Sequence, residues 1–257
     1  MKAPAFAYAK PASLREALEL LANPDAKVLA GGQSLIPSLN MRLSSPGLLV
    51  DIGGIEELKH IEHKNGAVHI GAVVTHASLE RSEVVRKHVP LLTQAVPYVA
   101  HAAIRNRGTL GGSLALADPA AEYPAVAVAL EASIHIEGRS GKRRVAARDF
   151  FKGLFETDLK PGELLTSVEF PAAKPSDRSV FLELARRHGD YAIVGLAAHN
   201  DRFVFFGVGP APFLLKGGSK EALKKEFKPT ADLYNSASTK LHLAGILLER
   251  AWKTLST

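Results

Sequence analysis

The 257-residue sequence contains no cysteine. Without thiols, the chain can form no disulfide bond, no iron–sulfur cluster bound through cysteine and no thiol nucleophile. No apolar run is long enough to span a bilayer, and residues 1–10 are too short and too polar a segment for a secretory signal. The hydrophobic residues, 46% of the sequence, are enough for a sizeable core. Because neither a membrane span nor a secretory signal is evident, we expect a soluble, cytoplasmic protein.

Several signatures of catalytic and nucleotide-binding sites are also missing. There is no G-x-S-x-G elbow for a serine nucleophile, and no glycine-rich loop ends in the Gly-Lys-Ser/Thr of a P-loop. Residues 207–212 begin like a Rossmann fingerprint but end in prolines. His60 and His63 have a spacing that would suit metal ligands on a helix, but no third ligand is near them, so we predict surface histidines and no metal site.

The net charge of +6 raises the question of nucleic-acid binding. The densest basic run is residues 138–144 (GRSGKRR), and no aromatic residues alternate with its charges, as a base-stacking surface would require. The run predicts a charged hairpin turn, either solvated or facing an acidic protein partner, and no nucleic-acid site.

Two glycine-rich turns are the most informative feature that is present. Residues 30–34 (AGGQS) follow the apolar run 27–29, and residues 104–113 (IRNRGTLGGS) form the second segment. Glycine lets backbone N–H groups approach a phosphate closely, and Ser or Thr adds a hydroxyl donor. Two such turns suggest one diphosphate held from both sides, as in a dinucleotide such as FAD. Ser34 is also expected to cap a helix over residues 35–43.

The remaining pattern predicts a mixture of helices and strands. Ser13 and Glu16 form a capping box that begins an amphipathic helix over residues 13–22. The other expected helices cover 75–85, 90–100, 123–130, 220–227 and 239–255. The expected strands cover 27–30, 48–52, 67–70, 133–136, 163–171, 180–185, 192–198 and 202–208. The polar segment 174–179 predicts a domain boundary.

Seven segments, taken in order, resemble the FAD-binding medium subunit of molybdenum hydroxylases, a family that includes the medium subunits of carbon monoxide dehydrogenase and the central domain of xanthine dehydrogenase. The segments span nearly the whole chain: 30–37 (AGGQSLIP), 104–113, 117–125 (ADPAAEYPA), 149–153 (DFFKG), 161–165 (PGELL), 187–195 (RHGDYAIVG) and 242–245 (HLAG).

The resemblance implies an α+β fold: a two-part FAD-binding domain of the vanillyl-alcohol oxidase (PCMH) type over residues 1–175, with sub-parts 1–55 and 56–175, and a small α+β C-terminal domain over 176–257. It places the diphosphate between residues 31–35 on one side and Thr109, Gly111, Gly112 and Ser113 on the other. It places the nucleotide and ribityl groups near Asp118 and Glu122, and the flavin ring near Leu165 and Tyr191. The implied cofactor-binding residues are Leu29, Ala30, Gly31, Gly32, Gln33, Ser34, Leu35, Thr109, Gly111, Gly112, Ser113, Asp118, Glu122, Leu165, Asp190 and Tyr191.

The function implied is electron transfer. A large molybdopterin-binding subunit would oxidise the substrate, and a small subunit with 2Fe–2S clusters would pass electrons to FAD on this chain, in a dimer of heterotrimers with no catalytic side chain here. Two alternatives remain open at this point: a self-sufficient flavin oxidoreductase, for which Tyr191 is the one candidate acid or base, and a non-enzymatic nucleotide sensor. We expect valine at Gly32 or Gly111 to abolish FAD retention while the fold survives.

Overall fold

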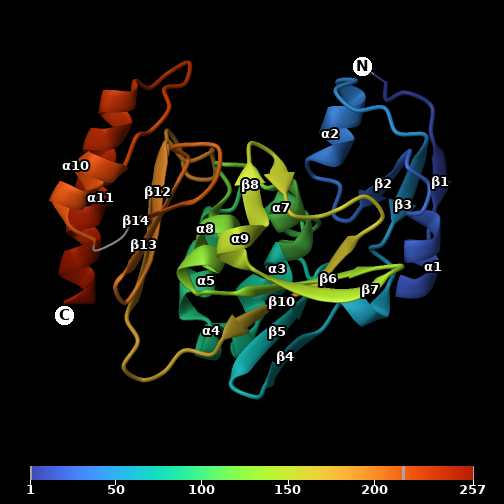
Figure 1. The fold of residues 1–257 in the computed structure, drawn as a ribbon, viewed down its shortest axis with the longest axis horizontal. Coiled ribbons are helices and arrows are strands. Elements are labelled where there is room, and N and C mark those ends of the chain that lie inside the picture. Colours follow the sequence, from blue (N-terminus) through green and yellow to red (C-terminus); the bar gives the residue numbers. More distant parts are fainter. Residues whose placement is uncertain (1, 216–217, 257) are drawn as a thin grey trace.

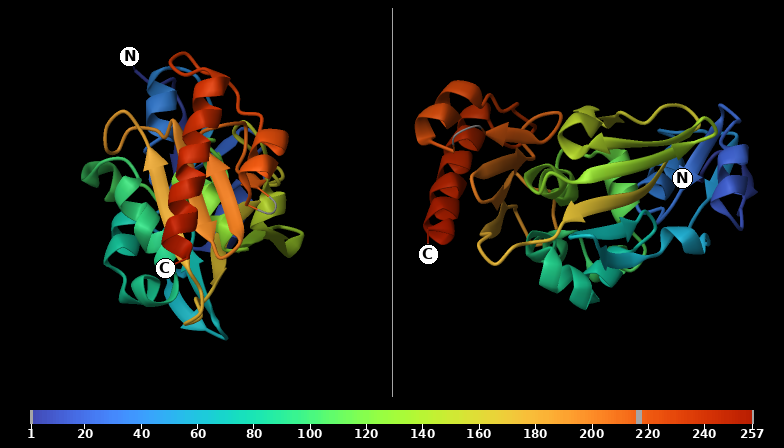
Figure 2. Two further views of the ribbon diagram at one scale, coloured as in Figure 1. Left: turned by 90° about the vertical axis from the view of Figure 1, so that its left-hand side faces the viewer. Right: turned by 60° about the horizontal axis from the view of Figure 1, so that its bottom comes forward.

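The computed structural model describes residues 2–215 and 218–256, and three larger β-sheets follow one another along its long axis (Figure 1). The first lies at the end that carries the N-terminal segment, the second in the middle, and the third next to the last helix (Figure 2). The mixture of helices and strands confirms the predicted α+β class. Within the described ranges, no helix is both long enough and apolar enough to cross a membrane.

The N-terminal part is a parallel sheet connected by helices. Strands β1 (Ala7–Ala9), β3 (Leu48–Asp51) and β2 (Ala26–Leu29) lie in that order, and helices α1 (Leu14–Leu20) and α2 (Leu35–Asn40) connect them. The predicted cap is present, because Ser13 Oγ accepts a hydrogen bond from the N–H of Glu16. Ser34 precedes α2 but makes no side-chain cap, which corrects that expectation.

The middle part is built on a five-stranded antiparallel sheet in the order β4-β5-β10-β6-β7. Its strands are β4 (Ile61–Lys64), β5 (Ala67–Gly71), β6 (Ser133–Gly138), β7 (Gly141–Ala146) and β10 (Leu164–Pro171). The helical elements are η1 (Glu56–Leu58), α3 (His76–Arg81), α4 (Glu83–His88), α5 (Pro90–Ala95), η2 (Val96–Tyr98), α6 (Ala102–Arg105), α7 (Leu110–Leu116), α8 (Glu122–Ala129) and α9 (Ala147–Phe150). A small ribbon, β8 (Phe151–Gly153) with β9 (Glu156–Thr157), lies beside them.

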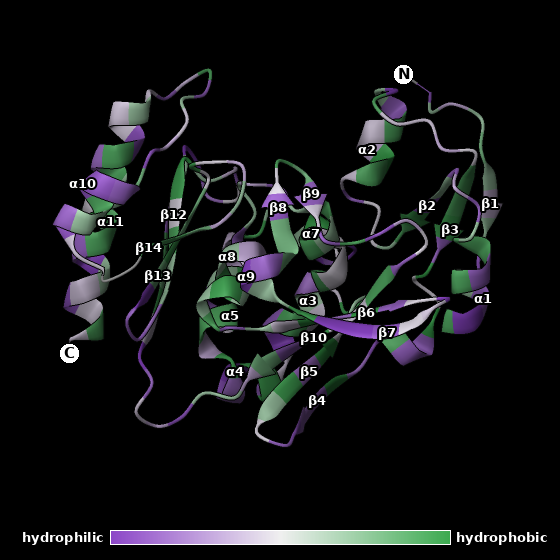
Figure 3. Ribbon diagram, viewed as in Figure 1, coloured by the Kyte–Doolittle hydropathy of each residue, from purple (hydrophilic) through white to green (hydrophobic). Residues whose placement is uncertain are grey.

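The basic run forms the predicted hairpin, and β7 is visible as a hydrophilic strand at the sheet edge (Figure 3). Most of its charge is neutralised within the chain. Arg143 lies 2.6 Å from Asp158 and 2.5 Å from Glu163, and Lys142 pairs with Glu137 at 3.3 Å. The hairpin therefore offers an acidic partner less free positive charge than its composition suggests.

The C-terminal part is an antiparallel sheet between helices. Strands β11 (Ser179–Leu184), β12 (Val194–His199), β13 (Arg202–Phe206) and β14 (Phe213–Leu215) lie in sequence order, followed by α10 (Lys220–Glu226) and α11 (Ala237–Leu255). Helix α11 packs on β11 and β12, while α8 of the middle part packs against β12 and β13. Every residue of α8 is buried, which explains why its sequence after Glu122 is apolar on all sides of the helix.

Two of the expected helices are interrupted. Ser82 takes an extended conformation and caps α4, so the helix predicted over 75–85 is divided into α3 and α4. The helix predicted over 90–100 ends at Ala95 and continues as the short 3₁₀ turn η2, which contains Pro97. Strands β1, β4 and β14 were not predicted, because they are short and carry no clear alternation of polar and apolar residues.

Candidate functional site

A cavity of about 1260 Å³ lies where the three parts meet. It exceeds the roughly 300–1,000 Å³ that is typical of small-molecule sites, and so suits a ligand as long as a dinucleotide. All the predicted site residues except Leu29 line it: Ala30, Gly31, Gly32, Gln33, Ser34, Leu35, Thr109, Gly111, Gly112, Ser113, Asp118, Glu122, Leu165, Asp190 and Tyr191. Leu29 ends β2, and its side chain instead lies against Gly32.

The first glycine loop presents free backbone donors to this cavity. No acceptor within the described residues is hydrogen-bonded to the backbone N–H of residues 31–34. Gly32 has a φ of +72°, a conformation that side-chain-bearing residues rarely adopt. Gln33 Nε2 donates to Gly31 O at 3.1 Å, which steadies the loop. Four consecutive unpaired N–H groups on one loop form a cradle suited to phosphate oxygens.

The second glycine segment has a different structure from the one predicted. Gly111 and Gly112 lie in the first turn of α7, and their N–H groups are already bonded to Ala72 O at 2.9 Å and to Thr109 Oγ1 at 3.1 Å. Because both N–H groups already have acceptors within the chain, the contact of Gly111 and Gly112 with the diphosphate stays a prediction, and the free backbone donors lie in the first loop. The hydroxyls of Thr109 and Ser113, which also line the cavity, remain as donors from this segment.

The glycines of the second segment allow close backbone packing instead. A Cβ atom at Gly111 would lie 2.7 Å from Ala72 O and from Ala72 Cα. Backbone atoms cannot move away as a flexible side chain can, so valine at Gly111 would disturb the fold itself. This corrects the expectation that the fold survives that substitution.

The two segments meet in space, as the two-sided grip requires. A Cβ at Gly31 would overlap Arg107 O and lie 2.7 Å from Gly108 Cα, and a Cβ at Gly112 would lie 3.8 Å from Ala30 Cβ. Segments more than seventy positions apart in the sequence thus form one wall of the cavity.

Buried and half-buried carboxyl groups line or adjoin the cavity beyond α7. Burial, and then the nearby Asp118, raise the pKa of Glu122 to about 7. Burial also raises the pKa of Asp118, whose Oδ1 accepts a hydrogen bond from Ala120 N at 2.9 Å. Glu183, which was not predicted, has its pKa raised to about 8 by burial and by Glu122, and its Oε2 has no partner. At neutral pH Glu122 and Glu183 can therefore both donate and accept hydrogen bonds.

Tyr191 lies at the mouth of the cavity, with 72% of its surface exposed. It follows Gly189, whose φ is +83°, and Asp190, which pairs with Arg187 at 3.4 Å. Partial burial raises the pKa of Tyr191, as do the charges of Asp118 and Glu122. The ring is therefore a neutral, accessible surface beside the acidic end of the cavity, whereas Leu165 is a buried apolar residue of the lining.

Several lining residues were missed by the sequence analysis. His76 is buried, its Nδ1 has no partner, and burial lowers its pKa to about 4, so the imidazole is neutral. From the C-terminal part, Arg186 lies over the ring of Tyr234 at 4.8 Å, and Asp232 pairs with the buried Lys240 at 2.8 Å. Of these, all but Lys240 line the cavity. No local pattern marks them, because only the tertiary fold brings residues 186 and 232–235 to residues 30–35.

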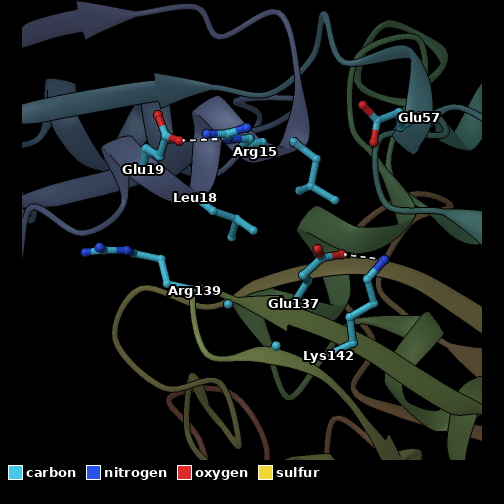
Figure 4. Close-up of a pocket in the computed structure, with 10 residues that line it drawn as sticks. Arg15, Leu18, Glu19, Glu57, Glu137, Arg139 and Lys142 are labelled. Atoms are coloured by element: carbon cyan, nitrogen blue, oxygen red, sulfur yellow. Dashed lines mark hydrogen bonds and ion pairs between the residues drawn. The ribbon is translucent and has the colours of Figure 1, made fainter.

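A second cavity, of about 560 Å³, lies between α1 and the β6–β7 hairpin (Figure 4). Its charged side chains largely neutralise each other: Arg15 Nε lies 3.1 Å from Glu19, and Lys142 Nζ lies 3.3 Å from Glu137. Such paired charges give a ligand little net attraction. Arg139, in the hairpin turn, lines both cavities.

Comparison with known proteins gives consistent results. The model of a family described as the FAD binding domain in molybdopterin dehydrogenase matches residues 4–173. Subunit alpha of the 6-hydroxypseudooxynicotine dehydrogenase complex of Paenarthrobacter nicotinovorans is 44% identical over 200 residues, which cover 77% of this chain and 68% of that one.

Solved structures agree over the full length. A chain of quinoline 2-oxidoreductase from Pseudomonas putida 86 superposes with a TM-score of 0.92 at 38% identity, covering 100% of this chain and 99% of the other. A chain of carbon monoxide dehydrogenase from Hydrogenophaga pseudoflava gives a TM-score of 0.95 at 33% identity, covering 99% and 98%.

Proposed function

Because the chain belongs to the family of FAD-binding domains in molybdopterin dehydrogenases, we propose that the cavity between its three parts is where it holds FAD. The observation that carries this proposal is the loop of residues 31–34, with four backbone N–H groups that lack a partner within the described chain. The diphosphate of FAD supplies the acceptors that such a loop requires. The donors present thus fit the cofactor of this family.

The chain is the FAD-binding medium subunit of a molybdenum hydroxylase, and so part of an oxidoreductase. When bound, FAD takes up electrons and passes them to an external acceptor. The task of this chain is to bind the cofactor, orient it and leave part of it accessible. None of the comparisons above supports the alternative of a self-sufficient flavin oxidoreductase.

The lining residues suggest a division of labour. The loop of residues 31–34 binds the diphosphate from one side, and the hydroxyls of Thr109 and Ser113 act from the other. Asp118, which is half-buried, and the buried Glu122, which accepts or donates a proton near neutral pH, form hydrogen bonds to the nucleotide and ribityl groups. Each hydrogen bond to a charged group contributes roughly 1.5–3 kcal/mol.

Two apolar or aromatic side chains complete the site. Leu165 packs near the flavin ring, and Tyr191 lies against it and limits access from solvent, with Asp190 fixing the turn through its pair with Arg187. Leu29 supports the phosphate-binding loop indirectly, because its side chain packs against Gly32.

The proposed partners are a large molybdopterin-binding subunit and a small subunit with 2Fe–2S clusters, assembled as a dimer of heterotrimers. The absence of cysteine supports this, because the clusters need ligands that this chain lacks. That relatives are named as subunits of complexes supports assembly in general.

We also propose two domains, 1–175 and 176–257. The face of the C-terminal sheet that packs on α11 has a hydrophobic cluster of its own, which supports a boundary in the polar segment 174–179, whereas Phe181, Val204 and Phe206 on the other face belong to the cluster of the five-stranded sheet. The interface formed by α8 explains why the two remain packed together.

The proposal is tested by purifying the chain from its host under mild conditions. We expect mass spectrometry to find a molybdopterin-binding chain and an iron–sulfur chain in equal amounts with it, and acid release to yield one FAD per chain. A chain that purifies alone, and whose FAD is bleached by a small organic substrate in stopped-flow photometry, would instead support the self-sufficient enzyme. A chain that takes up no FAD would support the nucleotide sensor.

A further inference from the structure

Three potential metal ligands lie together on the five-stranded sheet, outside the FAD cavity. His69 is on β5, Glu169 on the neighbouring β10, and His135 on β6 beyond it (Figure 1). None of the three lines either cavity described above. Among the residues that the structure describes, they form the one group of three or more His, Asp or Glu side chains whose ligand atoms all lie within 4.8 Å of one another.

The register of the sheet explains this meeting. His69 and Glu169 are direct partners across β5 and β10, and His135 pairs with Ser167, two positions from Glu169 on the same face. Thr166 is an extra residue in β10 at this point, a bulge of the kind that redirects side chains. The alternate residues of these strands, such as Ile70 and Val168, are fully buried, so the three ligands lie on the opposite face from the core.

The distances suit a metal ion. His135 Nε2 lies 2.9 Å from Glu169 Oε2. Metal–ligand bonds of about 2.0–2.2 Å at tetrahedral or octahedral angles put ligand atoms about 3.0–3.4 Å apart. The ligand atoms of the three side chains all lie within 4.8 Å of one another, so small side-chain rotations bring them to these separations. The side chains of His135 and Glu169 are 33% and 24% exposed, so an ion can reach them from solvent while being partly shielded.

We propose that His69, His135 and Glu169 bind one divalent ion of the zinc class, leaving a fourth position open to water. Two imidazoles and one carboxylate are a ligand set that suits Zn²⁺ and its first-row neighbours rather than Mg²⁺ or Ca²⁺, which prefer oxygen alone. The bound ion would tie together β5, β10 and β6 at the centre of the sheet.

The surrounding charges are compatible with this role. Glu62, the partner of His69 across β4, adds a further carboxylate on this face. Arg144 lies 3.7 Å from Glu169 Oε2, but its side chain is 62% exposed and can turn into solvent when a cation takes its place.

The test uses the full chain without an affinity tag, dialysed against EDTA and titrated with Co²⁺, whose absorption reports nitrogen and oxygen ligation, and then with Zn²⁺ by calorimetry. We expect one ion per chain. The variants His69→Ala, His135→Ala and Glu169→Gln should each weaken binding by about tenfold or more, since each removes one of three ligands. FAD content, which depends on a different site, should not change.

The chain offers a matched control. The rings of His63 and His88 are stacked with their centroids 3.8 Å apart, and His63 lies on the other face of the same sheet. If Co²⁺ bound unspecifically to neighbouring surface histidines, this pair would bind it too. His63→Ala and His88→Ala should leave Co²⁺ affinity within about twofold of wild type. The proposal is overturned if wild type binds no more Co²⁺ than His69→Ala does, or if the control variants lose as much affinity. Glu169→Gln keeps the shape of the side chain, so a loss of metal affinity in this variant is not caused by unfolding. Circular dichroism checks that each variant is folded.

Discussion

Replacing Gly32 with alanine tests the phosphate loop at its most sensitive position. Gly32 has a φ of +72°, and a Cβ there would lie 3.1 Å from Ile36 Cγ1 and 3.2 Å from Leu29 Cδ1. Both neighbours are flexible side-chain ends that can give way. The main effect of the methyl group is therefore the left-handed backbone conformation, which costs about 1–2 kcal/mol for a residue with a Cβ.

This penalty translates into lost affinity for FAD. Without ligand, the loop of the variant relaxes to negative φ at residue 32, and the N–H groups of residues 31–34 leave their wild-type positions. Binding must then restore the strained conformation, so affinity falls by the same 1–2 kcal/mol, or about 5- to 30-fold. Quenching of flavin fluorescence during titration of the FAD-free chain measures this change.

Gly66 provides the control. It has a φ of +74° in the turn between β4 and β5, with no atom within 4 Å of the added Cβ, and it lies outside the cavity. Gly66→Ala therefore carries the same conformational penalty without touching the site. Its thermal stability should fall while its FAD affinity stays at the wild-type value. If Gly32→Ala binds FAD as tightly as wild type, the loop does not hold the diphosphate and the reasoning fails.

Three further predictions concern other parts of the chain. Tyr191→Ala should keep FAD bound, because the side chain is 72% exposed. It should change the rate at which an external acceptor reoxidises the reduced chain. An identical rate in stopped-flow photometry would show that Tyr191 does not control access to the flavin. Glu122→Gln should flatten the dependence of Tm on pH. The wild-type pKa of about 7 exceeds the ordinary 4.5, so the folded chain holds a proton that the unfolded chain releases, and stability falls as pH rises between these values; parallel profiles for the two proteins would contradict this. Arg143→Ala should destabilise the chain by about 2–3 kcal/mol in urea, because it removes the short ion pairs with Asp158 and the poorly exposed Glu163. Arg148→Ala, which removes an exposed ion pair, should change stability by no more than about 0.5 kcal/mol. Equal effects of the two arginine variants would refute the structural role of Arg143.

Local chemistry predicted much of the fold. The Ser13 cap, the hairpin around residues 138–144 and the last two helices follow from capping, turn residues and periodicity, all of which act over a few positions. The errors arose where a single residue interrupts a pattern. Ser82 ends one helix and begins the next, and Thr109 turns an expected glycine loop into the start of α7.

The site was predictable only in part. Residues 30–34 and 104–113 could be named because glycine and hydroxyl residues cluster in the sequence. Their separate tasks, free donors in one segment and close packing in the other, depend on whether the fold brings a distant acceptor to each N–H group, as it brings Ala72 O to Gly111. Glu183 and His76 carry no such local signal. The three proposed metal ligands illustrate the same limit, since His135 and Glu169 are 34 positions apart and only the strand register joins them.

The central claim is that the loop of residues 31–34 binds the diphosphate of FAD, and comparing FAD with riboflavin in equilibrium titrations of the FAD-free chain tests it most directly. Riboflavin has the same ring but no phosphate. With at least two charge-assisted hydrogen bonds of about 1.5 kcal/mol each, FAD should bind about 100-fold more tightly or better. Equal affinity for the two flavins would contradict the account.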